Sequence, residues 1–222
     1  MRSRGATLIE LLISMSMFLL ILATVFLLFG IASRGFRTVE SRQLAQNQLA
    51  AIRASLQTDL QVSHFYGVRV DTSTSFLLKG VEQPRHALSA VALEDWDNRD
   101  TYGVPIWDRW VAYRVSNEEK GQLLRHVVLP PAGQSGRDLL RPADGLAMLA
   151  GTVAPYNPAW ANISPPLVLA RGLRSLQARL DNEQRAVELS VTIEQKAEGQ
   201  SVKSDVLTAT FYIKPHNTVP TD

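Results

Sequence analysis

Cysteine is absent from the 222-residue sequence. This excludes a disulfide framework and an acylated lipoprotein cysteine, so any exported part of the chain must be held together by packing alone. Histidine is scarce, and the four present are His64, His86, His126 and His216. None has the two-ligand spacing of a zinc motif such as HExxH. Residues 133–136, Gly-Gln-Ser-Gly, stop one residue short of G-x-S-x-G, and no phosphate-binding glycine loop follows a predicted strand.

Proline is absent from the first 83 residues, because Pro84 is the first in the chain. Nothing before it forces a helix to break, although Gly30 and Gly35 each cost about 1 kcal/mol of helix propensity and allow a bend. Apolar residues then follow at steps of three, four and four: Leu49, Ile52, Leu56 and Leu60. This spacing gives a narrow apolar stripe on one helix face, with Asp59 expected off it. We predict one long helix over about residues 7–63.

Neither sign of charge is in large excess, because 23 basic side chains nearly balance 21 acidic ones. Residues 1–64 hold six of the basic and three of the acidic side chains, so residues 65–222 are almost neutral. A near-neutral globular part has no electrostatic footprint for nucleic acid, and we expect no nucleic-acid partner. The length suits one hydrophobic core and is too short for two.

The most informative stretch is an uncharged apolar run over residues 11–32. At about 1.5 Å per helical residue it reaches roughly the 30 Å of a bilayer's hydrocarbon, so we predict a transmembrane segment there. Glu10 stands at the start of this run, preceded by Arg2 and Arg4. A lone carboxylate in lipid costs at least a few kcal/mol and therefore needs a partner, a proton or a functional role.

Three interpretations fit this stretch. The first is a plain single-pass anchor with Arg2 and Arg4 held in the cytoplasm. The second is a cleaved secretory signal with a small-residue site at 30–32, although the run is longer than the usual apolar core of about 7–15 residues and Glu10 interrupts it. The third rests on residues 5–12, Gly-Ala-Thr-Leu-Ile-Glu-Leu-Leu.

Those eight residues resemble the N-terminal motif of type IV prepilins and type II secretion pseudopilins. The resemblance implies that residues 1–5 are a leader cut after Gly5 by a prepilin peptidase. It also implies that Ala6 becomes the N-methylated first residue, where the family usually has a large apolar residue. Glu10 would be the retained acid that recruits the subunit into a filament, because the amine of one subunit can neutralise Glu10 of the next.

Beyond residue 64 the apolar period changes to two, which is typical of half-buried strands. We expect strands at 68–70, 76–79, 87–93, 110–115, 122–129, 176–180, 187–193 and 206–213, with an irregular, proline-rich stretch over 130–166 and a short helix at 145–149. The predicted fold is α+β, a pilin-like lollipop. Its long N-terminal helix, residues 6–64, packs on a mainly antiparallel sheet domain, residues 65–222.

A second resemblance lies in residues 110–115 (Trp-Val-Ala-Tyr-Arg-Val) and 122–125 (Gln-Leu-Leu-Arg), with support from 169–173. These segments resemble the hairpin of the larger minor subunits, the W-type minor pilins and J-type pseudopilins. Tyr113 and Arg125 are expected to be structural, at the core edge and rim. The resemblance implies a non-catalytic minor pilin of a type IV pilus that primes assembly or joins the tip complex. The alternative is a minor pseudopilin of a type II secretion system.

The resemblance also implies partners and a location. The partners are other pilins through the N-terminal helix, the prepilin peptidase, the inner-membrane assembly platform and a tip adhesin through residues 130–166. The N-terminus would be cytoplasmic and the sheet domain periplasmic, with later transfer to a filament. A membrane-tethered periplasmic enzyme is the remote alternative.

An acidic loop offers the one candidate metal site, with Asp95, Asp97 and Asp100 as possible calcium ligands. Arg99 interrupts the loop, and neither a turn glycine nor a distal bidentate glutamate completes an EF-type site. We therefore predict a solvated loop, with no metal or cofactor.

Mass spectrometry of the mature N-terminus distinguishes the three interpretations. Methyl-Ala6 is expected from the prepilin motif, whereas Ser33 would indicate a secretory signal and Met1 a plain anchor. Replacing Gly5 by alanine should leave the full-length chain uncut in the membrane, because the motif places the scissile bond after this glycine. A product of mature size from the Gly5→Ala variant would contradict the processing prediction.

Overall fold

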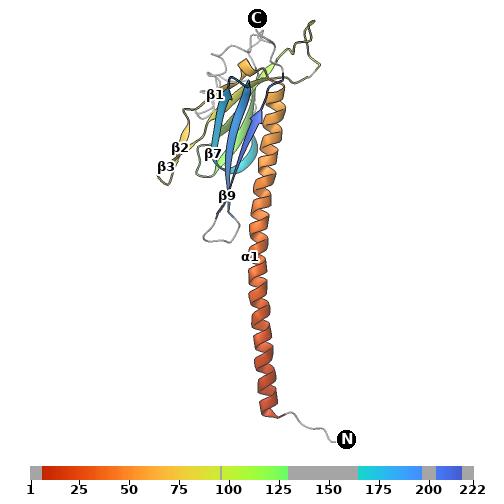
Figure 1. Ribbon diagram of the computed structural model, residues 1–222, viewed down its shortest axis with the longest axis vertical. Coiled ribbons are helices and arrows are strands. Elements are labelled where there is room, and N and C mark those ends of the chain that lie inside the picture. Colours follow the sequence, from red (N-terminus) through yellow and green to blue (C-terminus); the bar gives the residue numbers. More distant parts are fainter. Residues whose placement is uncertain (1–6, 96, 130–164, 197–203, 217–222) are drawn as a thin grey trace.

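The protein is a long helical stalk with a β-sheet domain at its C-terminal end (Figure 1). The computed structural model describes residues 7–95, 97–129, 165–196 and 204–216. Helix α1 spans Leu8–Gln61 without interruption, so the glycines Gly30 and Gly35 do not break it. The predicted α+β class, with one long apolar N-terminal helix on a mostly antiparallel sheet, is confirmed.

In the described residues, the elements after α1 are a 3-10 turn and nine strands. They are η1 Phe65–Gly67, β1 Arg69–Asp71, β2 Ser75–Leu78, β3 Val81–Pro84, β4 Ala87–Ala92, β5 Arg109–Val115, β6 Gly121–Val128, β7 Leu167–Asp181, β8 Ala186–Lys196 and β9 Ser204–Ile213. Seven of the strands form one sheet in the order β1-β4-β5-β6-β7-β8-β9, with every neighbouring pair antiparallel. Strands β2 and β3 form a separate hairpin that projects from the domain (Figure 1).

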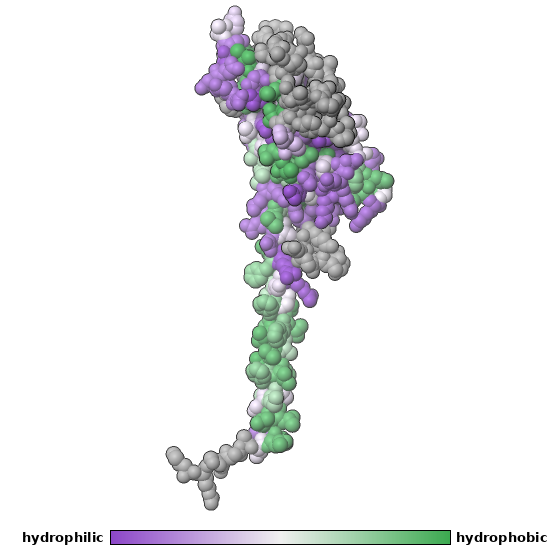
Figure 2. Space-filling model, turned by 180° about the vertical axis from the view of Figure 1, so that it is seen from behind, coloured by the Kyte–Doolittle hydropathy of each residue, from purple (hydrophilic) through white to green (hydrophobic). Residues whose placement is uncertain are grey.

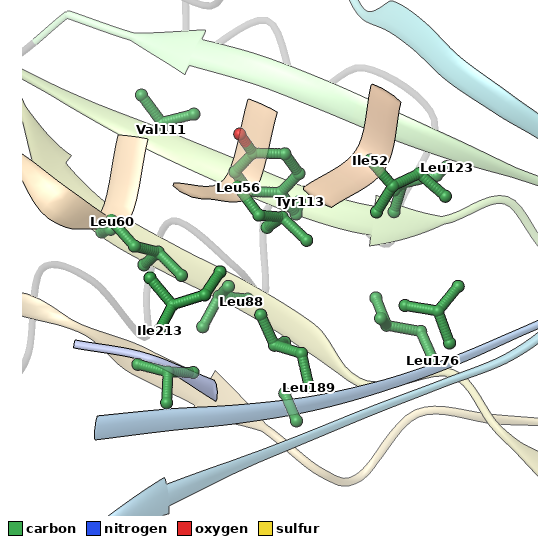
Figure 3. Packing of buried hydrophobic residues seen from close by; sticks show 14 of the residues in the cluster. Ile52, Leu56, Leu60, Leu88, Val111, Tyr113, Leu123, Leu176, Leu189 and Ile213 are labelled. Carbon is green, nitrogen blue, oxygen red and sulfur yellow. The ribbon is translucent and has the colours of Figure 1, made fainter. Parts of the chain in front are cut away.

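The second half of α1 packs on the sheet through the predicted stripe. Ile52, Leu56 and Leu60 are buried, and Leu49 packs against them at the margin. In Figure 3, Ile52, Leu56 and Leu60 of the helix lie among side chains of the sheet that include Leu88 of β4 and Ile213 at the end of β9. The core therefore lies between one face of the helix and the concave face of the sheet.

Strand β5 is buried on both of its faces. Val111 and Tyr113 join the core beneath α1, whereas Trp110 and Ala112 join a second apolar cluster with Trp107. This division follows the predicted alternation along residues 110–115. Two buried faces explain why four consecutive residues of this strand, 110–113, carry no charge.

Two features of the sheet differ from the prediction. Strand β7 is fifteen residues long rather than five, since it pairs with β6 through its first half and with β8 through its second. Gly172 lies between these halves at φ +77°, and a Cβ there would come within 2.6 Å of the Glu194 carbonyl oxygen. Strand β3 was not expected; it follows the Lys79-Gly80 turn, whose two positive φ angles fit a tight hairpin. The helix predicted at 145–149 lies outside the described residues.

A fragment beginning at Ser33 should fold as a β-rich monomer without added metal, because the buried part of α1 begins at Ser41. In this fragment Leu56→Ala should lower the free energy of unfolding by about 3 kcal/mol, as expected for a cavity in a packed core. Leu44→Ala is the control, since Leu44 is 52% exposed on the same helix, and it should cost less than about 0.5 kcal/mol. Urea unfolding followed by circular dichroism measures both; equal losses would contradict the assigned packing.

Candidate functional site: an exposed apolar helix and its fastening to the sheet

The first half of α1 is an apolar surface without protein cover in the described part of the chain. Every residue from Leu8 to Phe29 is exposed, and the large side chains are at least about two-fifths accessible. Figure 2 shows this surface as a continuous hydrophobic column below the hydrophilic domain. Soluble proteins rarely expose so much contiguous apolar area. The helix is long and apolar enough to cross a membrane.

Glu10 is the single charged side chain on this column, and it lies in the first turn of α1. Thr7 is the N-cap residue, and its hydroxyl accepts a hydrogen bond from the Glu10 backbone N–H at 3.4 Å. The Glu10 carboxylate in turn accepts one from the Thr7 backbone N–H at 2.9 Å. This reciprocal pair is a capping box, which supplies side-chain acceptors to two backbone N–H groups at the start of the helix.

Glu10 therefore has a partner within its own chain. The sequence already offers this partner, because residues 7–10 have the Thr-x-x-Glu spacing. That spacing is the standard signature of a capping box and could have found this contact. Gly5 and Ala6, the predicted cleavage and methylation residues, lie outside the described residues.

The second half of α1 is fastened to the sheet by a buried carboxylate, Asp59. Arg125 of β6 donates two hydrogen bonds to this carboxylate, from Nε to Oδ2 at 2.7 Å and from Nη2 to Oδ1 at 3.0 Å. The Tyr113 hydroxyl of β5 donates to the same Oδ2, and Ser55 Oγ lies 3.0 Å from that hydroxyl. We call these residues, Ser55, Asp59, Tyr113 and Arg125, the helix clamp.

The protonation states of Tyr113 and Arg125 suit their hydrogen bonds to Asp59. Burial and the neighbouring Asp59 carboxylate raise the pKa of Tyr113 far above its ordinary value of 10.0, so the phenol stays protonated and donates. The hydrogen bonds from Arg125 to Asp59 raise the pKa of this guanidinium, which stays charged. A bidentate arginine is the geometry that best satisfies a carboxylate removed from water. Ser55, whose hydroxyl faces that of Tyr113, completes the network as a donor.

The clamp fixes the helix against the sheet in one register. Tyr113 and Arg125 are directly opposite each other in the β5–β6 ladder, so both strands present their polar tips to one turn of α1. Tyr113 is fully buried in the core rather than at its edge, and Arg125 is half-buried at the rim, as expected. The expectation that Asp59 lies off the apolar stripe was wrong, because Asp59 is only 7% exposed. It follows Leu56 by three residues and therefore belongs to the same helix face.

A buried cation, Arg85, holds the turn at the end of the β5–β6 hairpin. Its guanidinium donates to the carbonyl oxygens of Ser116 at 2.6 Å and Glu118 at 2.7 Å, and it lies 4.1 Å from the centre of the Phe76 ring. Burial lowers the pKa of Arg85. Since Phe76 belongs to β2, this side chain also ties the projecting hairpin to the domain.

Two of the three candidate calcium ligands accept hydrogen bonds within local turns. Asp95 Oδ1 accepts from the Asp97 N–H at 2.9 Å, and Asp100 Oδ1 accepts from the N–H groups of Tyr102 and Val104. Among the described residues, histidine and acidic side chains form no group of three that could hold a metal ion. The structure thus does not bring Asp95, Asp97 and Asp100 together into a site.

Removing the clamp carboxylate should loosen the stalk from the domain. In the fragment beginning at Ser33, Asp59→Ala should cost about 3 kcal/mol of unfolding free energy, because it leaves the Arg125 charge partly buried without its partner. Arg53→Ala on the exposed side of the same helix is the control and should cost less than about 0.5 kcal/mol. Denaturant unfolding of the three proteins tests this; an Asp59→Ala loss as small as the control's would refute the clamp.

The two halves of α1 thus do different things. The first presents a bare apolar column with a capped carboxylate at its tip, and the second is locked to the sheet by apolar packing and by the clamp. An uncovered apolar helix of this kind can pack within a membrane or against other helices. Comparison with protein-family models, with curated proteins and with solved structures gave no match.

Proposed function

We propose that this protein is a non-catalytic subunit of a type IV pilin-like filament, a minor pilin that primes assembly or forms part of the tip complex. The observation that carries the proposal is the unbroken helix Leu8–Gln61, whose first half is bare and apolar and whose second half is packed on the domain. The prepilin-like motif of residues 5–12 sits at the beginning of this helix. Both features suit a subunit that is held in a membrane and then joins a helical bundle.

The exposed apolar column explains physically why the subunit would be held in the membrane before it joins a filament. Apolar surface of this extent is stable in lipid, and in a filament the same surface is covered by the equivalent helices of neighbouring subunits. The leader, residues 1–5, would be removed by a prepilin peptidase on the cytoplasmic side. The sheet domain would be periplasmic before assembly, and the assembly platform of the inner membrane would move the helix out of lipid.

Glu10 would exchange its partner on assembly. In the single chain its carboxylate accepts from the Thr7 N–H. After cleavage Ala6 would carry a free amine, and the amine of a neighbouring subunit would bring a full positive charge to the carboxylate. Within a dry helical bundle such a charge pair favours one register of the subunits, because a carboxylate without its cation is strongly disfavoured there.

The size of the sheet domain supports a low-copy role. With residues 65–222 outside the stalk, the subunit carries a broad head that suits the end of a filament better than its densely packed shaft. The partners would be other pilins along α1 and a tip adhesin on the domain. A minor pseudopilin of a type II secretion system is the second candidate, since the motif of residues 5–12 occurs in both families.

Substitutions at Glu10 test the assembly role and separate charge from capping. Glu10→Ala should be cut normally but should be depleted from sheared filaments by at least about 100-fold, since losing one partner of a buried ion pair costs 3 kcal/mol or more. Glu10→Gln keeps a capping side chain but no charge and should be depleted similarly.

The control is Glu40→Ala, an exposed charge on the same helix, which should enter filaments at the wild-type level. Quantitative immunoblots of sheared filaments and membranes measure all three variants. Wild-type incorporation of Glu10→Ala would refute the proposed role. Incorporation of Glu10→Gln alone would assign it to helix capping instead of charge pairing.

A further inference from the structure

Between the apolar column and the packed half of α1 lies a segment that belongs to neither. The uncharged apolar run ends at Ala32, and the first buried residue of the helix is Ser41. Residues 33–40, which we call the collar, therefore extend over about 12 Å of helix. None of these eight residues is buried, and a Cβ added at Gly35 would meet nothing within 4 Å.

The collar exposes basic and aromatic side chains. Phe36 is 77% exposed and Val39 is 62% exposed, and Arg34 and Arg37 are exposed on either side of Phe36. The small polar side chain of Thr38 instead turns back to its own helix, where its hydroxyl donates to the Arg34 carbonyl oxygen at 3.1 Å. The outer surface of the collar is thus made of the long cationic and large apolar side chains.

The position of these arginines needs an explanation. Residues 33–48 contain three arginines and one glutamate. If the N-terminus is cytoplasmic, they follow the membrane segment on its far side, where the positive-inside tendency does not place basic residues. A headgroup layer is about 5–8 Å thick on each side of a bilayer, so a helix leaving the hydrocarbon near Ala32 carries Arg34, Phe36 and Arg37 through it.

We propose that the collar binds the phosphate headgroups of anionic phospholipids in the leaflet nearest the sheet domain. Arg34 and Arg37 contact the lipid phosphates, and Phe36 lies between them at the level of the headgroups, where aromatic side chains are favoured. The inference rests on the membrane-spanning part of the proposed function. It adds a lipid class, and a device that sets how deep the helix sits before assembly.

The lipid preference is tested with the full-length chain purified from mixed micelles of phosphatidylglycerol and phosphatidylcholine. Each arginine near an anionic surface is worth about fivefold, so the double variant Arg34→Gln, Arg37→Gln should lose about 30-fold of its preference for phosphatidylglycerol. Arg53→Gln, further along the same helix, is the control and should keep the preference. Mass spectrometry of the bound lipids gives the ratio; equal ratios for the double variant and the wild type would overturn the inference.

Placement is tested with single-cysteine labels, which the cysteine-free chain allows. A fluorophore at Gly35→Cys should become shielded from an aqueous quencher as phosphatidylglycerol replaces phosphatidylcholine in vesicles, and a fluorophore at Leu20→Cys should be shielded in both. Shielding at Gly35 that follows the protein-to-lipid ratio would indicate a neighbouring helix and overturn the inference. Exposure at Leu20 would overturn the membrane span itself, whereas a shielded Leu20 with an unresponsive Gly35 would overturn the lipid contact alone.

Discussion

The structure depends on one helix, α1, whose backbone hydrogen bonds continue from an exposed apolar half into a half that is packed on the sheet. Helix α1 runs for 54 residues, which is about 80 Å. Isolated helices gain little from propensity alone, and most helices in proteins are stabilised by the face that they bury. Here the second half has such a face and the first half has none within the described chain. The first half is therefore stable as a helix only where lipid or other helices surround it.

The clamp shows how a narrow stripe can specify a unique docking. Apolar packing of Ile52, Leu56 and Leu60 is strong but tolerant of small slides along the helix. A buried carboxylate is intolerant of them, because moving it by one turn would separate it from both Tyr113 and Arg125. Polar contacts of this kind contribute specificity more than net stability, and the stalk gains a defined orientation on the head.

Sequence reasoning succeeded where a pattern is local. The absence of proline and the spacing of Leu49, Ile52, Leu56 and Leu60 predicted the helix, and period-two alternation predicted most strands. It failed where the deciding partner is distant in sequence. Asp59 looked like a surface residue because nothing near it reveals Arg125, which is 66 residues away. Strand β7 was underestimated because Gly172 interrupts the alternation at the point where the strand changes partners.

The candidate site divides in the same way. The apolar column and Glu10 were evident from the sequence, because an acidic residue at the edge of a long apolar segment is easily recognised. The contact between Glu10 and Thr7 is also local, and it was overlooked rather than hidden. The role of Arg85 could not have been foreseen, because its partners are carbonyl oxygens that every residue possesses.

Because α1 is unbroken through the collar, the position of the sheet domain along the helix axis is coupled to its rotation about that axis. An α-helix advances about 1.5 Å and turns about 100° with each residue. Because Gly30 and Gly35 do not interrupt the helix, inserting or deleting one residue in the collar would raise or lower the head only slightly but would swing it by more than a quarter turn about the long axis. The number of residues between the column and Ser41 therefore fixes the rotation of the sheet domain about the helix axis. This rotation decides which side of the domain faces a neighbouring molecule.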